Sequence, residues 1–156
     1  MGAGASVSDI VSGELNVTVC AGKDLVAKDG GWLSKASSDP FVKVFVGGAE
    51  VAKTATVSKN LSPEWNEKVL TDFIVGPKAR KDPTVRFRIF DYDMMSASDP
   101  MGDVVIALDG LLDGKPKDAW LPVQPCEGCK KVKGELHVIV SFAPRKALTL
   151  ASGTFA

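Results

Sequence analysis

Short runs of alternating apolar and polar residues recur along the chain, and no run has the period of a helix longer than a turn or two. Clusters rich in Gly, Pro, Asn and Ser separate these runs. We expect strands at residues 14–20, 41–46, 50–57, 67–75, 84–90, 104–108, 119–123 and 134–142, with a one-turn helix or a tight turn at 109–112. This regular spacing indicates an all-β fold, an eight-stranded antiparallel β-sandwich.

The length of 156 residues fits one domain with a full core. We expect a flexible segment over 1–11, the folded domain over 12–143 and a loose tail over 144–156. Trp65 and Trp120 are predicted to be core or corner residues, because the runs that flank them are expected to be buried. Nineteen basic and nineteen acidic residues leave no net charge, so no global charge favours nucleic acid.

The sequence favours a cytoplasmic protein without catalytic activity. No apolar run is long enough for a transmembrane helix, and the N-terminus lacks the apolar core of a secretory signal. Three cysteines are an odd number, which fits a reducing compartment. Cys126 and Cys129 form half of a zinc or redox motif, for which a plain exposed hairpin is the favoured interpretation. His137 is the single histidine, and no catalytic constellation accompanies it.

An acidic segment follows the run 84–90. It carries Asp91, Asp93 and Asp99, and unpaired ionised groups are too costly to bury. Calcium is the natural partner, because it takes six to eight oxygen ligands and tolerates irregular loops. Met94 and Met95 lie between the acids at the expected loop tip. The segment therefore suggests a loop that binds metal and touches an apolar surface, although packing against a neighbouring loop would also explain the methionines.

A second acidic loop follows the first run. It contains Asp29 and Asp39, with the apolar pair Trp32 and Leu33 between them. This loop, the loop around residues 60–66 and the acidic segment follow the first, third and fifth expected strands. Alternate loops of an antiparallel sandwich cluster at one end, so the five aspartates of the two acidic loops are expected to converge.

With these residues in view, the chain resembles the C2 domain, the calcium- and phospholipid-binding module of protein kinase C, synaptotagmins and phospholipases. The resemblance covers residues 12–143. The matching residues are 25–29, 38–44, Lys53, Thr54, 60–67, 90–93, Ser96, Asp99 and Gly102. It implies a Greek-key sandwich of type II topology, in which the chain starts at the strand leading into the first calcium loop.

The resemblance also implies a set of ligands for two or three calcium ions. They are Asp29, Asp39, Asp91, Asp93 and Asp99, with the carbonyl of Tyr92 and the side chain of Ser96 completing the shell. Nine residues separate Asp29 from Asp39, more than is common in the family. This insertion either carries Trp32 and Leu33 deeper into a membrane or displaces Asp29 from the site.

The function implied is calcium-dependent binding of a monomer to anionic phospholipid membranes, as a docking or signalling module in membrane trafficking. The expected membrane contacts are Trp32, Leu33, Met94 and Met95. Lys43 and Lys53 lie on adjacent expected strands and resemble the basic face by which some family members bind phosphoinositides. A calcium-independent protein-interaction or scaffold module is the alternative, and a small calcium buffer is a third interpretation.

The first six residues match the pattern for N-myristoylation at Gly2. A flexible, small-residue N-terminus explains the same pattern. One myristoyl chain gives only marginal membrane binding, so a second signal would be required. Calcium-dependent docking of the loops would supply it and make the protein a peripheral membrane protein.

Overall fold

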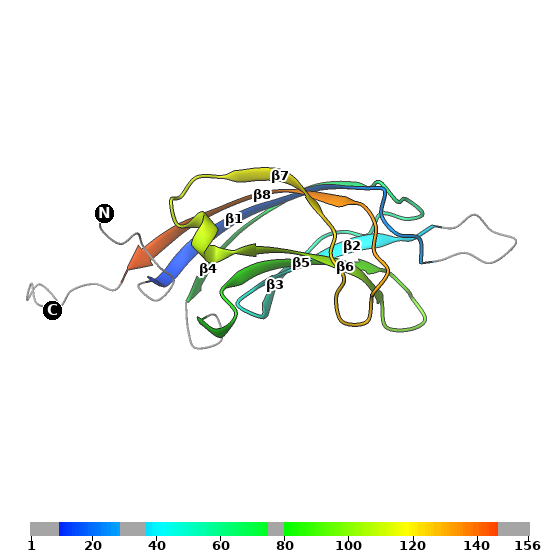
Figure 1. Cartoon of the computed structure of the whole chain (residues 1–156), viewed down its shortest axis with the longest axis horizontal. Helices are drawn as coiled ribbons and strands as arrows, with labels where there is room; N and C mark the ends of the chain where they lie inside the picture. The colour runs from blue at the N-terminus through cyan, green and yellow to red at the C-terminus, as the bar shows by residue number, and fades with distance from the viewer. Residues whose placement is uncertain (1–9, 29–36, 75–79, 147–156) are drawn as a thin grey trace, which may run out of the picture.

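The computed structural model describes residues 10–28, 37–74 and 80–146. Within them, eight strands form two four-stranded antiparallel sheets (Figure 1). The strands are β1 (Ile10–Lys23), β2 (Pro40–Val46), β3 (Ala49–Lys53), β4 (Glu64–Ile74), β5 (Thr84–Asp91), β6 (Asp99–Ala107), β7 (Lys117–Pro122) and β8 (Glu135–Lys146). A 3-10 helix, η2 (Leu108–Leu111), follows β6 at the predicted turn of helix. The predicted eight-stranded β-sandwich is confirmed.

The strand order agrees with the predicted topology. One sheet has the order β4-β1-β8-β7 and the other β3-β2-β5-β6. The first and last strands are neighbours, paired from Ile10 and Lys146 to Lys23 and Glu135. β1 leads directly into the first loop, as the type II arrangement requires.

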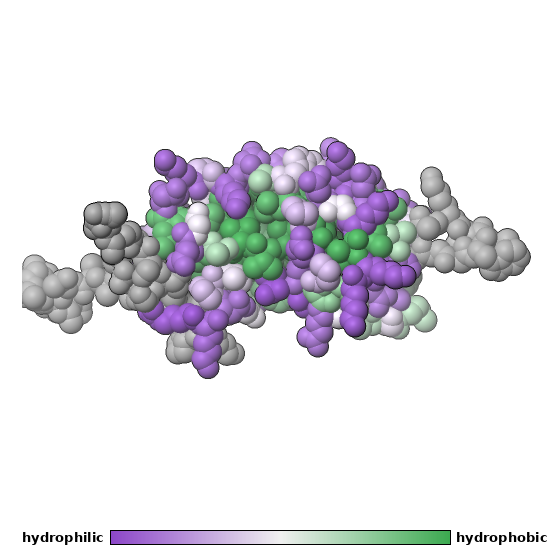
Figure 2. Space-filling view, in the orientation of Figure 1, coloured by the Kyte–Doolittle hydropathy of each residue, from purple (hydrophilic) through white to green (hydrophobic). Residues whose placement is uncertain are grey.

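Alternating burial along the strands builds the core between the sheets. On β5, Val85, Phe87 and Ile89 are fully buried while the residues between them are partly exposed. Apolar residues of β1 and β8 face them from the other sheet and belong to the same core cluster. Figure 2 shows hydrophobic residues gathered along the middle of this face, with hydrophilic residues toward the outer surfaces. Trp65 is buried in this core, as predicted.

Several strand ends differ from the expectation, and three of them have a clear cause in the pairing. β6 begins at Asp99 instead of residue 104, because its pairing with β5 continues as far as the Asp91–Asp99 pair. β8 continues to Lys146, where it pairs with the start of β1. β3 ends at Lys53 instead of residue 57, and the hydroxyl of Thr54 then accepts a hydrogen bond from the amide of Val42.

Trp120 contradicts its prediction as a core or corner residue. Its side chain is 43% exposed and stacks on the ring of His137, with ring centroids 5.0 Å apart. β7 is an edge strand, and Trp120 lies on its solvent-facing side. His137 also pairs with Asp118 through a 2.6 Å contact between Nε2 and Oδ1.

Candidate functional site

Three loops meet at one end of the sandwich, away from the start of β1 and the end of β8 (Figure 1). They are loop 1 (residues 24–39, of which the structure describes 24–28 and 37–39), loop 2 (54–63) and loop 3 (92–98). The amide of Tyr92 donates to the carbonyl of Asp39 at 2.9 Å, which joins loop 3 to loop 1. The amide of Asn60 donates to the carbonyl of Ser38 at 3.0 Å, which joins loop 2 to loop 1. The predicted convergence of the three loops is confirmed.

The base of loop 1 is held by a buried hydroxyl. Ser38 is fully buried, and its Oγ accepts the amide of Lys28 at 2.8 Å and donates to the carbonyl of Val26 at 3.0 Å. One side chain thus ties together the two ends of loop 1. These two hydrogen bonds fix the backbone at Ser38 and therefore the position of the next residue, Asp39.

Asp91 occupies an inward position of β5, in phase with Ile89, because side chains alternate along a strand. Its side chain is 2% exposed, and Oδ1 accepts the amide of Asp39 at 2.8 Å. A buried carboxylate at a strand end needs hydrogen bonds or positive charge to offset its desolvation. The sequence thus directs a carboxylate toward the place where loops 1 and 3 meet.

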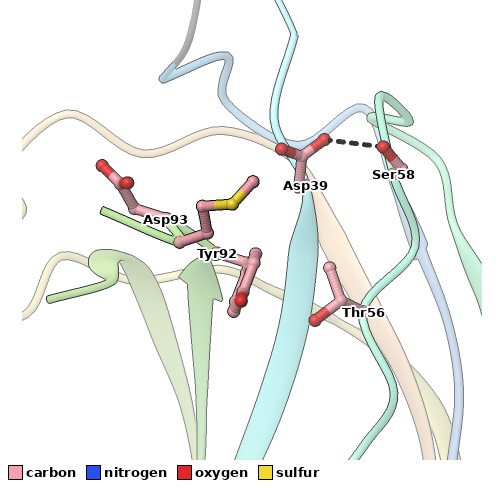
Figure 3. A pocket seen from close by; sticks show the side chains of 6 residues that line it. Asp39, Thr56, Ser58, Tyr92 and Asp93 are labelled. Carbon is pink, nitrogen blue, oxygen red and sulfur yellow. Dashed lines mark hydrogen bonds between the residues drawn. The ribbon is translucent and has the colours of Figure 1, made fainter. Parts of the chain in front are cut away.

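Asp39 is engaged by loop 2. Its Oδ1 accepts the amide of Lys59 at 2.6 Å and the hydroxyl of Ser58 at 3.2 Å. Figure 3 shows the carboxylate between β2 and loop 2, directed at Ser58. Lys59 adopts a positive φ of 49° at this contact.

Asp93 is engaged within loop 3. Oδ1 accepts the amide of Met95 at 2.8 Å, and Oδ2 accepts the hydroxyl of Ser96 at 2.9 Å. The amide of Met95, followed by the Ser96 hydroxyl, lowers the pKa of Asp93, because both bonds favour the charged carboxylate. Asp93 therefore stays ionised at neutral pH, and in Figure 3 it points away from Asp39.

The carboxylates supply suitable oxygen donors but do not form a cluster of three. Asp99 is exposed and directly opposes Asp91 at the start of β6. Among the described residues, no three carboxylate, His or Cys side chains lie close enough to hold a metal ion together. The donor chemistry fits calcium, but Asp39 and Asp93 must exchange their local hydrogen bonds for an ion.

An open pocket of about 570 Å³ lies between the loops (Figure 3). It is lined by Asp39, Thr56, Ser58, Tyr92, Asp93 and Met94. The hydroxyls of Thr56 and Ser58 were not predicted as part of the site, because neither is distinctive in the sequence. Loop 2, which carries both residues, lies at the site because the strand order of the sandwich places it next to loops 1 and 3.

The tip of loop 3 is apolar and faces solvent. Met94 is 79% exposed and Met95 is 88% exposed. Packing of these methionines against a neighbouring loop, the alternative interpretation, does not agree with such exposure. A pair of exposed methionines is the kind of feature that marks an interaction site.

The predicted lysine pair lies on the outer face of the second sheet. Lys43 and Lys53 are directly opposed across β2 and β3. The Nζ of Lys43 lies 5.4 Å from the ring centroid of Phe90, and that of Lys53 lies 6.0 Å from that of Phe41. Glu50 pairs with Lys43 at 3.2 Å. The lysines therefore form a basic surface over stacked aromatic rings.

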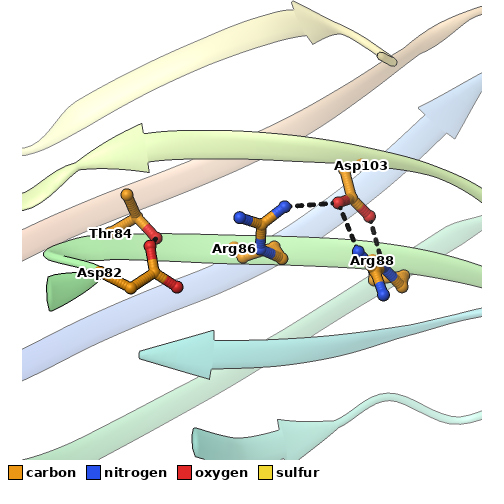
Figure 4. Close-up of polar contacts among 5 residues, drawn as sticks. All are labelled: Asp82, Thr84, Arg86, Arg88 and Asp103. Carbon is orange, nitrogen blue, oxygen red and sulfur yellow. Dashed lines mark hydrogen bonds and ion pairs between the residues drawn. The ribbon is translucent and has the colours of Figure 1, made fainter. Parts of the chain in front are cut away.

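A charged cluster on the same sheet was not predicted. Asp103 is buried and accepts three hydrogen bonds, from Nη1 of Arg86 at 2.6 Å and from Nε and Nη2 of Arg88 at 2.7 and 2.8 Å (Figure 4). Alternating arginines on β5 are the signal that could have indicated it. Burial tends to raise the pKa of Asp103, but the hydrogen bonds from Arg88 and Arg86 outweigh it and lower the pKa.

Four of the predicted site residues lie outside the described residues. They are Gly2, Asp29, Trp32 and Leu33. Their predicted roles stay predictions. The described part of the chain contains no helix long and apolar enough to cross a membrane.

The family model of the C2 domain matches residues 13–123. This chain belongs to the C2 domain family. A human relative, "Multiple C2 and transmembrane domain-containing protein 1", is 34% identical over 113 residues, which are 71% of this chain and 10% of the relative. The C2 chain thus spans about a tenth of that relative's length.

Solved structures resemble this C2 fold over most of its length. A C2 domain of plant Extended Synaptotagmin 1 has a TM-score of 0.66 and 28% identity, covering 86% of this chain and 97% of that one. A pair of C2 domains of Extended-Synaptotagmin 2, described as calcium bound, gives a TM-score of 0.68 at 23% identity, covering 86% of this chain and 46% of that one. The second match supports the fold alone.

Proposed function

We propose that this C2 domain docks on anionic phospholipid membranes in a calcium-dependent manner through loops 1 and 3. The observation that carries the proposal is the hydrogen bond from the amide of Asp39 to the buried carboxylate of Asp91. This bond places Asp39 beside Asp91, from a distant segment of the chain, at the end of the sandwich that bears the exposed Met94 and Met95.

The ion would be held by oxygens of the loops. The described candidates are Asp39, Asp91, Asp93 and Asp99, with the carbonyl of Tyr92 and the hydroxyl of Ser96; Asp29 is a further candidate by resemblance. Bound calcium would supply positive charge where the loops alone are negative and would accept phosphate or carboxylate oxygens of lipid headgroups. Met94 and Met95 would then bury apolar surface in the membrane interface.

The proposal is tested by co-sedimentation with phosphatidylserine vesicles. Asp93→Asn with Asp99→Asn removes two exposed carboxylates without touching the core, and we expect the calcium needed for half-maximal pelleting to rise at least about tenfold. Asp91→Asn with Asp93→Asn should abolish the calcium response. The matched control is Asp109→Asn with Asp113→Asn, two exposed acids in and after η2, at the other end of the molecule (Figure 1).

Calcium-dependent pelleting that survives Asp91→Asn with Asp93→Asn would refute the proposal, provided that the variant is folded. The alternative function, a calcium-independent protein-interaction module, predicts no pelleting of the wild type with or without calcium. A calcium buffer predicts that the ion binds but that vesicles do not.

A second candidate function, binding of phosphoinositide headgroups, is favoured by the lysine pair. Lys43 and Lys53 present two ammonium groups over Phe90 and Phe41 on one sheet face. We expect Lys43→Ala with Lys53→Ala to weaken pelleting with vesicles that contain phosphatidylinositol bisphosphate and to leave pelleting with phosphatidylserine alone nearly unchanged. Equal losses on both vesicles would contradict a specific headgroup site.

A further inference from the structure

Cys126 and Cys129 face each other across a tight hairpin. The amide of each residue donates to the carbonyl of the other, and both distances are 2.9 Å. Glu127 and Gly128 form the turn, where Gly128 adopts a φ of +83° that a side chain would rarely tolerate. A pair that exchanges both hydrogen bonds is directly opposed, with side chains on one face and Cα atoms about 5.5 Å apart.

This separation suits a disulfide bond. Bridged cysteines have Cα atoms about 4.4–6.8 Å apart, so the Cα separation of an opposed hairpin pair lies within the range of disulfides. Both cysteines are free thiols in the structure. Cys126 is half-buried and therefore the more accessible thiol, whereas Cys129 is 3% exposed and lies 3.3 Å from the carbonyl of Lys131. The predicted plain exposed hairpin is thus wrong for Cys129.

The surroundings of Cys126 restrain its reactivity. Burial raises the pKa of the Cys126 thiol, and the negative charge of Asp103 raises it further. Asp103 is held beside the hairpin, because its backbone exchanges hydrogen bonds of 2.9 and 2.8 Å with Gln124. Cys126 is therefore a thiol at neutral pH, and its oxidation should accelerate as the pH rises.

We propose that Cys126 and Cys129 form a reversible intramolecular disulfide when a low-molecular-weight disulfide, such as oxidised glutathione, is the oxidant. The Cys126 thiolate attacks one sulfur of the oxidant, forms a mixed disulfide and releases one small thiol. The Cys129 thiolate then attacks the sulfur of Cys126 and releases the second small thiol. The two protein thiols lose two electrons and two protons, and the oxidant is reduced to two thiols.

The bond would lie beside the candidate membrane site. An added Cβ on Gly128 would lie 3.1 Å from Cγ of Pro100, the residue that follows Asp99. The hairpin therefore packs against β6 near the end of loop 3. This modification site is independent of the proposed function, because it requires neither calcium nor lipid.

Thiol mapping of the full chain in graded glutathione buffers tests the proposal. Both cysteines fall in one tryptic peptide, residues 118–130, and Cys20 falls in another, residues 1–23. Cys20 is buried on β1 and serves as the internal control. After acid quenching and alkylation, we expect peptide 118–130 to lose the mass of two hydrogen atoms and to resist alkylation, while Cys20 is alkylated after unfolding.

Variants and an unfolded reference sharpen the test. Cys129→Ser should trap a glutathione adduct on Cys126, and Cys20→Ser should leave the disulfide unchanged. Because the folded hairpin holds the thiols opposed, the native chain should favour the disulfide by about tenfold over the same chain in urea. A doubly alkylated 118–130 peptide in oxidising buffer, a bond to Cys20, or a disulfide favoured more strongly in urea would overturn the proposal.

Discussion

Asp103 is a buried carboxylate that pairs with two arginines of β5. It is 3% exposed and accepts two hydrogen bonds from Arg88 and one from Arg86. Arg88→Met should therefore lower the free energy of unfolding by about 2–3 kcal/mol, because the buried Asp103 carboxylate loses two of its three hydrogen bonds. Arg86→Met, the matched control, should cost about 1 kcal/mol. Urea unfolding measures the loss of stability in both variants. Equal losses would contradict a larger contribution of Arg88 than of Arg86 to the binding of Asp103.

The same contact predicts how stability depends on pH. The pKa of Asp103 is lowered in the folded protein, so the folded state binds this proton less readily than the unfolded state does. The stabilisation that the ionised Asp103 contributes is complete above about pH 4, the pKa of an Asp in the unfolded chain. It is lost as the pH falls through the lower pKa that Asp103 has in the folded protein. Urea unfolding should therefore show wild type and Asp103→Asn converging in stability below about pH 4. A constant difference would contradict this assignment.

Met94 and Met95 are expected to act in membrane binding and not in folding, because both are exposed by more than three quarters. Changing both to Ser should weaken calcium-dependent vesicle binding by about 10- to 100-fold, since each buried apolar side chain contributes about 1.5–3 kcal/mol at most. Thermal stability should not change. Leu70→Ser, at an exposed apolar residue of β4, is the control and should leave vesicle binding intact.

β5 shows how far a strand can be predicted from its sequence. The alternation of Val85, Phe87 and Ile89 fixes which face is buried, and Asp91 falls in the same phase. That phase, together with the acidic residues after it, was sufficient to predict a site at this strand end. The alternating arginines of the opposite face indicate a charged surface but not their shared partner, because Asp103 lies on another strand.

β8 begins after a glycine that no other residue can replace without strain. Gly134 has a φ of +89°, and an added Cβ would lie 2.2 Å from the carbonyl oxygen of Lys23. Gly134→Ala should lower the free energy of unfolding by about 1–3 kcal/mol from the backbone conformation alone, and the clash adds to this loss. Gly110→Ala meets no atom within 4 Å and should be nearly neutral. Equal stability of both variants in urea would contradict this account.

The arrangement of the whole sandwich explains why the meeting of the loops could be predicted and their local contacts could not. Loops after the first, third and fifth strands must share an end, so the meeting of Asp39 with Asp91 followed from strand order. The local partners of Asp39 did not follow, because Ser58 and Lys59 approach it through loop 2. Trp120 was placed wrongly for a similar reason, since nothing in its sequence neighbourhood shows that β7 is an edge strand.

Calcium-dependent membrane docking is tested most directly with the unacylated wild-type chain. Its co-sedimentation would be compared with phosphatidylserine and with phosphatidylcholine vesicles, each in millimolar calcium and in chelator. We expect pelleting with phosphatidylserine in calcium and none under the other three conditions. Equal pelleting in calcium and in chelator, or no pelleting of folded protein under any condition, would contradict calcium-dependent docking.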